Sequence, residues 1–176
     1  MAGVRTEIEI AAPPERIWHV LADLDAYPLW NPYLLRVDGR LKTGERLQVL
    51  SQPPGGRAAT HSPLIVKVEP FRELRWLGRP LRLPYLLDGE HAFTIEPLGP
   101  KQACLVQSEN FSGLLALIYM WLRGGRTRRG FEAMNQALKA RAERAAAPAG
   151  AGPKMAPAKT TRPPRSVKPA KRKRRH

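Results

Sequence analysis

SGLLALIYMWLRGGRTRRGFEAMNQALKARAERA, residues 112–145, is the longest segment of the chain with helical periodicity. Large apolar residues recur in it three or four positions apart, so they share one face of a helix. The pair Gly124 and Gly125 is expected to interrupt that helix, because each glycine costs about 1 kcal/mol relative to alanine. We predict a long C-terminal helix whose apolar face needs a covering layer. The face consists of Leu115, Ile118, Tyr119, Leu122, Phe131, Met134 and Leu138.

Upstream of this helix the apolar residues repeat with a period of two, which is typical of half-buried β-strands. Thr43 and Gly44 predict a tight hairpin turn, and Pro63 is expected to bend a long strand. Short links between the strands predict an antiparallel sheet with seven strands. The predicted strands span residues 5–10, 37–42, 45–51, 57–68, 72–77, 89–96 and 103–110.

Two short helices are predicted between the first and second strands. The first begins at Pro13 and Pro14, which a helix tolerates in its first turn. It should stop at Tyr27, because proline at position 28 disfavours the helical conformation for the residue before it. The second should begin within residues 29–33. The fold class is therefore α+β, with one sheet wrapped around the C-terminal helix.

The charge of the chain is concentrated at its C-terminal end. The 176 residues contain 30 Lys and Arg and 15 Asp and Glu, for a formal charge of +15. No acidic residue follows Glu143, and residues 148–176 contain ten of the basic residues. This segment has too few large apolar residues to offset the entropy of ordering. We predict one globular domain over residues 1–147 and a disordered basic tail over residues 148–176.

One cysteine, Cys104, excludes an internal disulfide and a cysteine-rich zinc site, and its apolar context predicts a buried thiol. The N-terminus shows no signal-peptide pattern. The longest apolar run, residues 114–122, is far shorter than the about 20 residues that span a bilayer. We therefore expect a cytoplasmic protein.

Several segments resemble the SRPBCC (START-related, helix-grip) superfamily. IAAPPERIW at 10–18 and YPLWNP at 27–32 are similar to its first strand and the helices that follow. GEHAFTI at 89–95 and ENFSGLL at 109–115 are similar to its last hairpin and the entry to its long helix. TRRGFEAMN at 127–135 resembles the second half of that helix. The resemblance extends over residues 4–145 and is closest to bacterial members described as polyketide cyclase/dehydrase-like.

The resemblance implies a cavity between the sheet and the long helix, and we expect bulky side chains from both to line it. Trp30 either lies at the mouth or packs its helix against the sheet. His91 either orients a ligand carbonyl or acts as a general base, or is an ordinary strand histidine. The expected ligand-binding residues are Trp30, Trp76, His91, Phe93, Phe111, Leu115, Tyr119 and Leu122.

Three further features have a plainer interpretation beside the functional one. Glu109 is interpreted as a solvated strand end rather than a buried acid. Four arginines at 123, 126, 128 and 129 could meet an acidic ligand, although a solvated basic face is the commoner explanation. Met120 and Trp121 could form an exposed apolar patch that admits a ligand or touches a membrane.

No metal site or cofactor is predicted. The oxygenase members of the superfamily bind iron through two histidines and a carboxylate. This chain has histidines at 19, 61, 91 and 176, and no two stand at ligand spacing on one predicted element.

The superfamily contains proteins of different function, so fold does not decide function here. A carrier or sensor of a hydrophobic small molecule, such as a lipid or polyketide-like compound, is the first hypothesis. A cyclase or dehydratase that acts on a polyketide-like substrate is the second, with His91 or Tyr119 as the acid or base. A cochaperone-like interaction domain is the third, and side chains would then fill its cavity.

The end of the tail is expected to bind polyanions, including nucleic acid, without sequence specificity. Its basic run lacks interleaved aromatic residues, so stacking on bases is not available. The run consists of Lys171, Arg172, Lys173, Arg174 and Arg175.

We predict that the tail supplies most of the affinity of the protein for polyanions. A chain that ends at Ala147 should elute from heparin at much lower salt than the full chain. The binding of the full chain should weaken steeply as salt rises, because bound phosphates release counterions. Equal retention of the two chains would assign the affinity to the arginines at 123–129 instead.

Overall fold

The computed structural model describes residues 2–79 and 85–146. A five-stranded antiparallel sheet has the order β1-β8-β7-β6-β5, and a three-stranded antiparallel sheet has the order β2-β3-β4. The larger sheet consists of β1 (Ala2–Ile10), β5 (Leu64–Glu69), β6 (Glu73–Gly78), β7 (Asp88–Gly99) and β8 (Gln102–Ser112). The smaller sheet consists of β2 (Leu34–Asp38), β3 (Gln48–Ser51) and β4 (Ala59–His61). The helices are α1 (Pro14–Ala22), the 3-10 helix η1 (Leu24–Leu29) and α2 (Ala116–Ala146).

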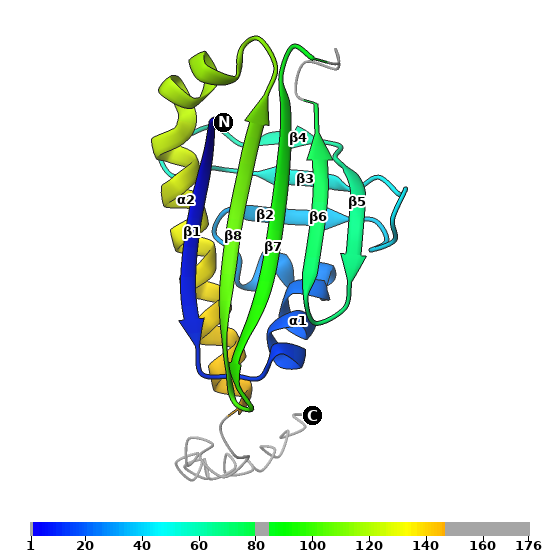
Figure 1. Ribbon diagram of the computed structural model, residues 1–176, viewed down its shortest axis with the longest axis vertical. Helices are drawn as coiled ribbons and strands as arrows, with labels where there is room; N and C mark the ends of the chain where they lie inside the picture. The colour runs from blue at the N-terminus through cyan, green and yellow to red at the C-terminus, as the bar shows by residue number, and fades with distance from the viewer. Residues whose placement is uncertain (1, 80–84, 147–176) are drawn as a thin grey trace, which may run out of the picture.

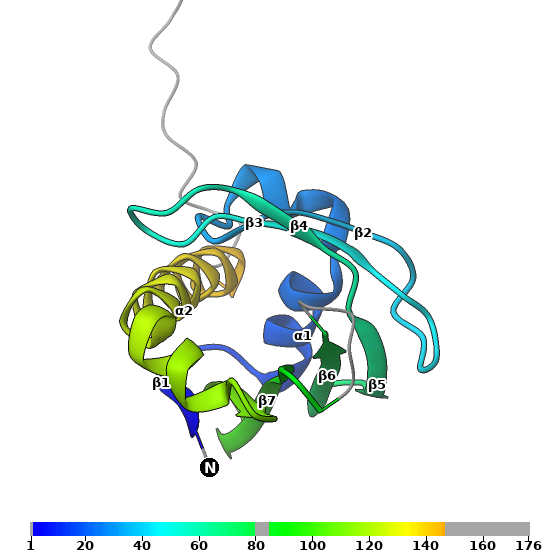
Figure 2. The same ribbon diagram turned by 90° about the horizontal axis from the view of Figure 1, so that it is seen from above.

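The two sheets lie on opposite sides of a common interior (Figures 1 and 2). The long helix α2 runs beside β1 and closes one side of that interior, and α1 lies inside near one end. The expected α+β arrangement of antiparallel strands around a long C-terminal helix is confirmed. The prediction of seven strands in one sheet was wrong, because residues 2–79 and 85–146 already form eight strands in two sheets.

Pro63 explains the extra strand. The segment predicted as one strand over 57–68 is divided between β4, which pairs with β3, and β5, which pairs with β6. Proline cannot donate a ladder hydrogen bond, and the chain crosses between the sheets at this residue. The Pro63 carbonyl accepts the N–H of Leu47 at 3.0 Å, which joins the crossing point to the segment before β3.

The tight turn predicted at Thr43 and Gly44 is present, since Glu45 donates its N–H to the Lys42 carbonyl at 3.0 Å, but the strands beside it do not pair up to the turn as predicted. Asp38 pairs with Gln48 at the end of the β2–β3 ladder, so residues 39–47 form a longer connection. Gly44 donates its N–H to the carbonyl of Ile65 at 2.9 Å. The backbone around the turn therefore pairs with the edge of β5 instead of extending the β2–β3 ladder.

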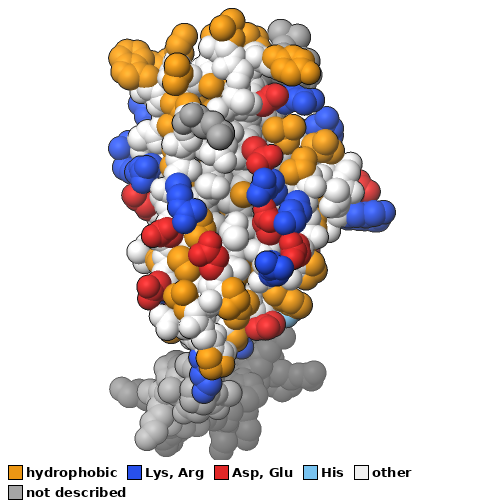
Figure 3. Space-filling view, viewed as in Figure 1, with side chains coloured by type: hydrophobic (Ala, Val, Ile, Leu, Met, Phe, Trp, Pro, Cys, Tyr) orange, Lys and Arg blue, Asp and Glu red, His pale blue; other side chains and the backbone are white. Residues whose placement is uncertain are grey.

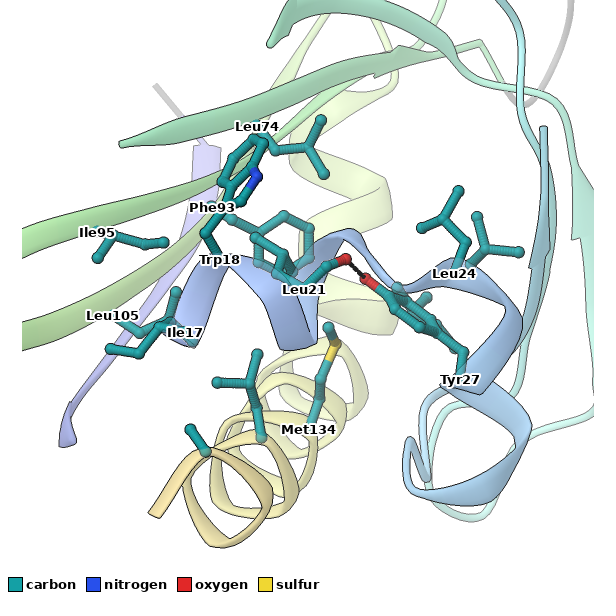
Figure 4. Packing of buried hydrophobic residues seen from close by; sticks show 14 of the residues in the cluster. Ile17, Trp18, Leu21, Leu24, Tyr27, Leu74, Phe93, Ile95, Leu105 and Met134 are labelled. Atoms are coloured by element: carbon teal, nitrogen blue, oxygen red, sulfur yellow. Dashed lines mark hydrogen bonds between the residues drawn. The ribbon is translucent and has the colours of Figure 1, made fainter. Parts of the chain in front are cut away.

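The second short helix lies earlier than predicted, over residues 24–29, and includes the proline expected to end α1. Tyr27 provides a reason. Its ring is fully buried, and its hydroxyl donates a hydrogen bond to the Leu21 carbonyl at 2.7 Å. This contact holds the segment against α1, as Figure 4 shows, and a short 3-10 helix has few backbone hydrogen bonds to lose at a proline.

The α2 helix is continuous through Gly124 and Gly125, contrary to prediction. Glycine costs about 1 kcal/mol in a helix, which tertiary packing of the remaining turns can offset. One glycine of α2 has a clear packing role. A Cβ atom at Gly130 would lie 2.6 Å from Cδ2 of Tyr33, so the absence of a side chain lets the Tyr33 ring rest on the helix.

The hydrophobic core occupies the end of the interior that contains α1. Figure 4 shows Ile17 and Leu21 of α1 among Phe93 and Leu105 of the larger sheet and Met134 of α2. All five are fully buried, and burial of such side chains contributes about 1.5–3 kcal/mol each. This packing fills one end of the interior, so a cavity can persist only toward the other end.

We predict opposite effects from alanine at two glycines of α2. Gly130→Ala should destabilise the protein by about 1–3 kcal/mol, because the new methyl group must displace the Tyr33 ring. Gly125→Ala should stabilise it by up to about 1 kcal/mol, because a Cβ atom there meets nothing within 4 Å. Urea unfolding of both variants measures the difference. Equal stability of the two would show that Tyr33 moves aside without cost.

Candidate functional site

A cavity of about 230 Å³ lies between the two sheets and the N-terminal half of α2. The larger sheet contributes residues from β6, β7 and β8, and the smaller sheet contributes residues from β2, β3 and β4. The helix contributes Tyr119, Arg123, Arg126 and Thr127. The cavity is therefore formed by three walls that are far apart in the sequence.

Strand alternation brings three functional side chains into one row. Trp76 pairs with His91 across β6 and β7, and His91 pairs with Glu109 across β7 and β8. Residues directly opposite each other on an antiparallel pair point to the same face. All three line the cavity, so the row presents an indole, an imidazole and a carboxyl group to its interior.

Glu109 is the residue whose chemistry the site changes most. Removal from bulk water raises the pKa of its carboxyl from 4.5 to about 7, because burial disfavours the charged form. No ion pair to Glu109 exists among residues 2–79 and 85–146. A Cβ atom at Gly89 would lie 3.1 Å from its Oε1, so a glycine on the neighbouring strand makes room for the carboxyl group.

Two tyrosines share the electrostatic environment of Glu109. Burial raises the pKa of Tyr33, and the negative charges of Glu109 and Tyr119 raise it further. Burial and Glu109 also raise the pKa of Tyr119, while Arg123 opposes them. Both hydroxyl groups therefore remain protonated at neutral pH and are available as hydrogen-bond donors. The cavity thus combines one carboxyl group with two hydroxyl groups.

His91 is a neutral part of the wall. Its ring centroid lies 4.5 Å from Phe93, 5.1 Å from Trp76 and 4.8 Å from Phe131. Burial, with a smaller effect from His61, lowers the pKa of His91 to about 3. The side-chain amide of Gln107 hydrogen-bonds to Nε2 of His91 at 3.0 Å. A group with so low a pKa is a weak base, and Glu109 is better suited to accept a proton.

The edge of the cavity is basic. Arg57, Arg79, Arg123 and Arg126 line it, and all four are exposed. Arg79 is paired with Asp88 at 3.1 Å. Positive side chains around an opening attract ligands with negative charge or electron-rich oxygen.

A second depression, of about 1010 Å³, is larger but lies on the surface between α1 and α2. Glu15, Arg16, Asp23 and Arg141 are among its lining residues. Glu15 and Asp23 are exposed to solvent, and Arg16 and Arg141 are only partly buried. The enclosed cavity with its perturbed carboxyl group is therefore the candidate site.

The family model for polyketide cyclase / dehydrase and lipid transport proteins matches residues 1–146. The chain belongs to this family. No curated protein matches the sequence.

Solved structures of similar fold agree with membership of the polyketide cyclase / dehydrase and lipid transport family. The Zhui aromatase/cyclase from Streptomyces sp. R1128 has a TM-score of 0.68 at 20% identity, over 84% of this chain and 97% of that chain. A START superfamily protein from Mycobacterium smegmatis has a TM-score of 0.62 at 22% identity, over 82% and 99%. Norcoclaurine synthase from Thalictrum, a point mutant in complex with a transition-state analogue, has a TM-score of 0.62 at 15% identity, over 82% and 95%. At these identities the likeness shows the fold alone.

Four of the residues expected to bind ligand line the cavity of this family member: Trp76, His91, Phe111 and Tyr119. Phe93 does not, because it lies one row deeper on β7 and is fully buried in the core. Trp30 packs against Tyr27 at a ring-centroid distance of 5.1 Å and lines the surface depression between α1 and α2 instead.

The two leucines expected in the cavity also lie elsewhere. Leu115 precedes α2, is half-buried and donates its N–H to the Leu86 carbonyl at 3.0 Å. Leu122 is 59% exposed. Of the predicted apolar face in this half of the helix, Tyr119 lines the cavity, whereas Ile118 and Leu122 face solvent.

The sequence interpretation missed several cavity residues, among them four that carry polar groups. Glu109 was interpreted as solvated, although it is two positions from the predicted Phe111 and in phase with it on β8. Arg123 and Arg126 were assigned to a solvated face, and they line the cavity edge. Tyr33 carried no local signal, since it follows η1 in an irregular segment.

Three other expectations concern the described residues. Cys104 is half-exposed rather than buried, because it alternates with the inward-facing residues of β8. No group of three or more His, Cys, Asp or Glu side chains that could hold a metal ion occurs in residues 2–79 and 85–146. Within the same residues no helix is long and apolar enough to cross a membrane. The predicted basic tail, including residues 171–175, lies outside the described residues.

We predict that Glu109→Gln becomes more stable than the natural protein as pH rises. The pKa of Glu109 is raised from 4.5 to about 7 in the folded state, so the folded protein retains a proton that the unfolded chain releases across this range. The free energy of unfolding therefore falls as pH rises through the range between these two pKa values, and glutamine at this position removes that loss. The variant should gain up to about 3 kcal/mol on the natural protein, less where cavity water solvates the carboxylate.

Urea unfolding at a series of pH values measures this difference. The pKa of His91, about 3, makes the free energy of unfolding of both proteins rise with pH. The reason is that the buried neutral histidine must become charged at low pH, which destabilises the folded state. The relevant quantity is therefore the difference between the two proteins. A difference that does not change with pH would show that Glu109 is solvated in the folded protein.

Proposed function

We propose that this protein binds a small, largely apolar molecule with at least one hydrogen-bonding oxygen in the cavity of about 230 Å³. The observation that carries the proposal is the enclosed cavity with an unpaired carboxyl group at one wall. Family membership supports a role in hydrophobic ligand binding or cyclisation. A carrier or sensor role is the first form of the proposal. The cochaperone-like hypothesis requires side chains to fill the cavity, and the remaining volume of about 230 Å³ counts against it.

Cavity size limits the class of ligand. An engineered cavity of about 150 Å³ with apolar walls binds benzene. A cavity of about 230 Å³ is therefore matched to a molecule of one or two rings, or to the terminal portion of a longer one. A long acyl chain exceeds the space unless part of it extends through the opening.

Polar groups in the cavity would orient the ligand. The hydroxyl groups of Tyr33 and Tyr119 can donate hydrogen bonds to a carbonyl or phenolic oxygen. Glu109 can accept a hydrogen bond when ionised and donate one when protonated. The ring faces of Trp76 and His91 provide an aromatic wall. A planar ligand with an oxygen substituent near Glu109 fits this arrangement.

The second candidate is catalysis of cyclisation or dehydration, and the pKa of Glu109 favours it. A carboxyl group with a pKa of about 7 exists in both protonation states at neutral pH, as an acid–base catalyst requires. The carboxylate would take a proton from the carbon beside a carbonyl group while a tyrosine hydroxyl donates to the carbonyl oxygen. The resulting acid would return that proton to a departing hydroxyl group, which leaves as water.

We predict that a side chain at Gly78 abolishes ligand binding. Gly78 lines the cavity. A Cβ atom at this position would have only the Gly89 carbonyl oxygen within 4 Å, at 3.7 Å, so a larger side chain has space to enter the cavity. Gly78→Leu should lower the affinity for 1-naphthol, a fluorescent two-ring phenol, by about tenfold or more, which corresponds to about 1.4 kcal/mol. Gly99→Leu is the matched control, because a Cβ atom there meets nothing within 4 Å and the position lies outside the cavity.

Fluorescence titration of the folded variants tests the proposal. Unchanged affinity in Gly78→Leu would contradict it. Glu109→Gln separates the two forms of the function, because it keeps a hydrogen-bonding group of similar size and removes the acid–base group. A carrier should tolerate this change with a modest loss of affinity, whereas a cyclase should retain binding of a polyketide-like substrate and lose turnover.

A further inference from the structure

A row of large apolar side chains lies exposed at the start of α2. Leu114 is 81% exposed, Leu117 is 75% exposed and Trp121 is 85% exposed. Ile118 and Leu122 are also exposed. Spacings of three and four residues place these side chains on one side of a helix. The side of α2 that faces solvent is therefore apolar over its first two turns, the reverse of the usual arrangement.

The inner side of the same two turns is already occupied. Tyr119 and Met120 pack against a cluster that contains Phe111 and Ala116. The exposed row consequently cannot be buried by rotation of the helix without exposure of this cluster. Figure 3 shows hydrophobic side chains gathered over the end of the molecule where α2 begins.

Tyr85 extends the apolar surface onto a neighbouring loop. It is 85% exposed, and its carbonyl accepts the N–H of Leu114 at 3.1 Å. The loop and the helix therefore form one surface, which we call the apolar cap. The apolar cap consists of Tyr85, Leu114, Leu117, Ile118, Trp121 and Leu122.

Positive charge without acidic residues follows the apolar cap along α2. Between Glu109 and Glu132 the sequence contains four arginines, at 123, 126, 128 and 129, and no acidic residue. All four are exposed. None forms an ion pair with any residue of the described ranges 2–79 and 85–146.

We propose that the apolar cap docks on the surface of a bilayer that contains anionic lipid. Amphipathic surfaces of this kind bury their apolar side chains at the boundary between headgroups and acyl chains. Tryptophan and tyrosine favour this boundary, where their polar atoms stay hydrated. The arginines complement lipid phosphates, and each basic residue near an anionic surface adds to the attraction.

Charge favours a lipid surface over a second copy of this chain as the occupant. A twofold interface brings the same patch of both subunits together. When the two copies of α2 run in the same direction, the arginines that follow the apolar cap approach those of the partner, and like charges repel. An anionic bilayer presents the opposite charge to the same residues.

The apolar cap and part of the cavity wall lie on the same turns of α2, so docking would also affect access to the cavity. Tyr119 and Arg123 of the cavity wall come from the turns whose outer side carries the cap. A docked molecule would hold this wall next to the bilayer, so an apolar ligand could pass between lipid and cavity with little exposure to water. This inference goes beyond ligand binding and does not require a reaction.

Vesicle binding by the full chain tests the proposal. The vesicles contain phosphatidylcholine with or without phosphatidylglycerol, and the lipids are brominated on their acyl chains so that they quench nearby tryptophan. Trp121 should be quenched by anionic vesicles, whereas Trp18 and Trp76 are 7% and 5% exposed and should not be. Trp121→Phe should remove most of the quenching while vesicles still sediment the protein.

Leu117→Asp should lower the affinity for anionic vesicles by about tenfold or more, because a carboxylate would enter the interface beside anionic lipid. Leu98→Asp is the matched control and should bind as the natural protein does, since Leu98 is 53% exposed in β7 near the opposite end of the molecule. Both variants should retain the affinity for 1-naphthol, so failure of docking and failure of ligand binding are distinguishable.

Two outcomes would overturn the proposal. Equal vesicle binding by Leu117→Asp and the natural protein, without quenching of Trp121, would assign the attraction to basic residues elsewhere. A dimer in sedimentation velocity that Leu117→Asp converts to a monomer, with no change in vesicle binding, would make the apolar cap a contact between copies of this chain.

Discussion

The α2 helix enters the main hydrophobic core only through its C-terminal half, and the rest of the structure depends on this constraint. Phe131, Met134 and Leu138 are fully buried, and they join the helix to the core formed with α1 and the larger sheet. The N-terminal half directs Tyr119 and Arg123 toward a space that no core residue fills. The cavity, its polar lining and the outward apolar row all arise from this change along one helix.

The cavity places Glu109 at an energetic cost. A carboxyl group without a counter-ion is more costly to ionise in the interior than in water, and its pKa of about 7 expresses that cost. Elsewhere on the larger sheet, Glu73 shows the contrasting case. Lys67 and Arg75 hydrogen-bond to its carboxylate and hold its pKa below the ordinary value despite its burial. The fold can therefore pair a buried acid when its surroundings supply cations, and in the cavity two tyrosine hydroxyl groups stand near the acid instead.

Several site residues were predictable from the resemblance and from residue type. The resemblance implied a cavity lined by bulky side chains of the sheet, so Trp76, His91 and Phe111 were expected there, and they line it. The same reasoning extended to Phe93, which points inward but lies at the depth of the core. Alternation reports the side of a sheet and not the depth along a strand, because depth depends on what packs from the opposite layer. Glu109 was misjudged for a related reason, since a charged residue near a strand end resembles a solvated one until the facing layer is known.

Periodicity along the chain was enough to establish the antiparallel strands, the long C-terminal helix and their order, because hydrogen-bonded backbone geometry sets those periods locally. It was not enough to decide that Pro63 divides one strand between two sheets, or that Tyr27 holds a proline-containing segment against α1. Tertiary structure alone decided the orientation of the N-terminal half of α2 and the approach of Tyr33 to Gly130. Those features depend on contacts between residues about a hundred positions apart, and no local pattern encodes which distant side chain will fill a given space.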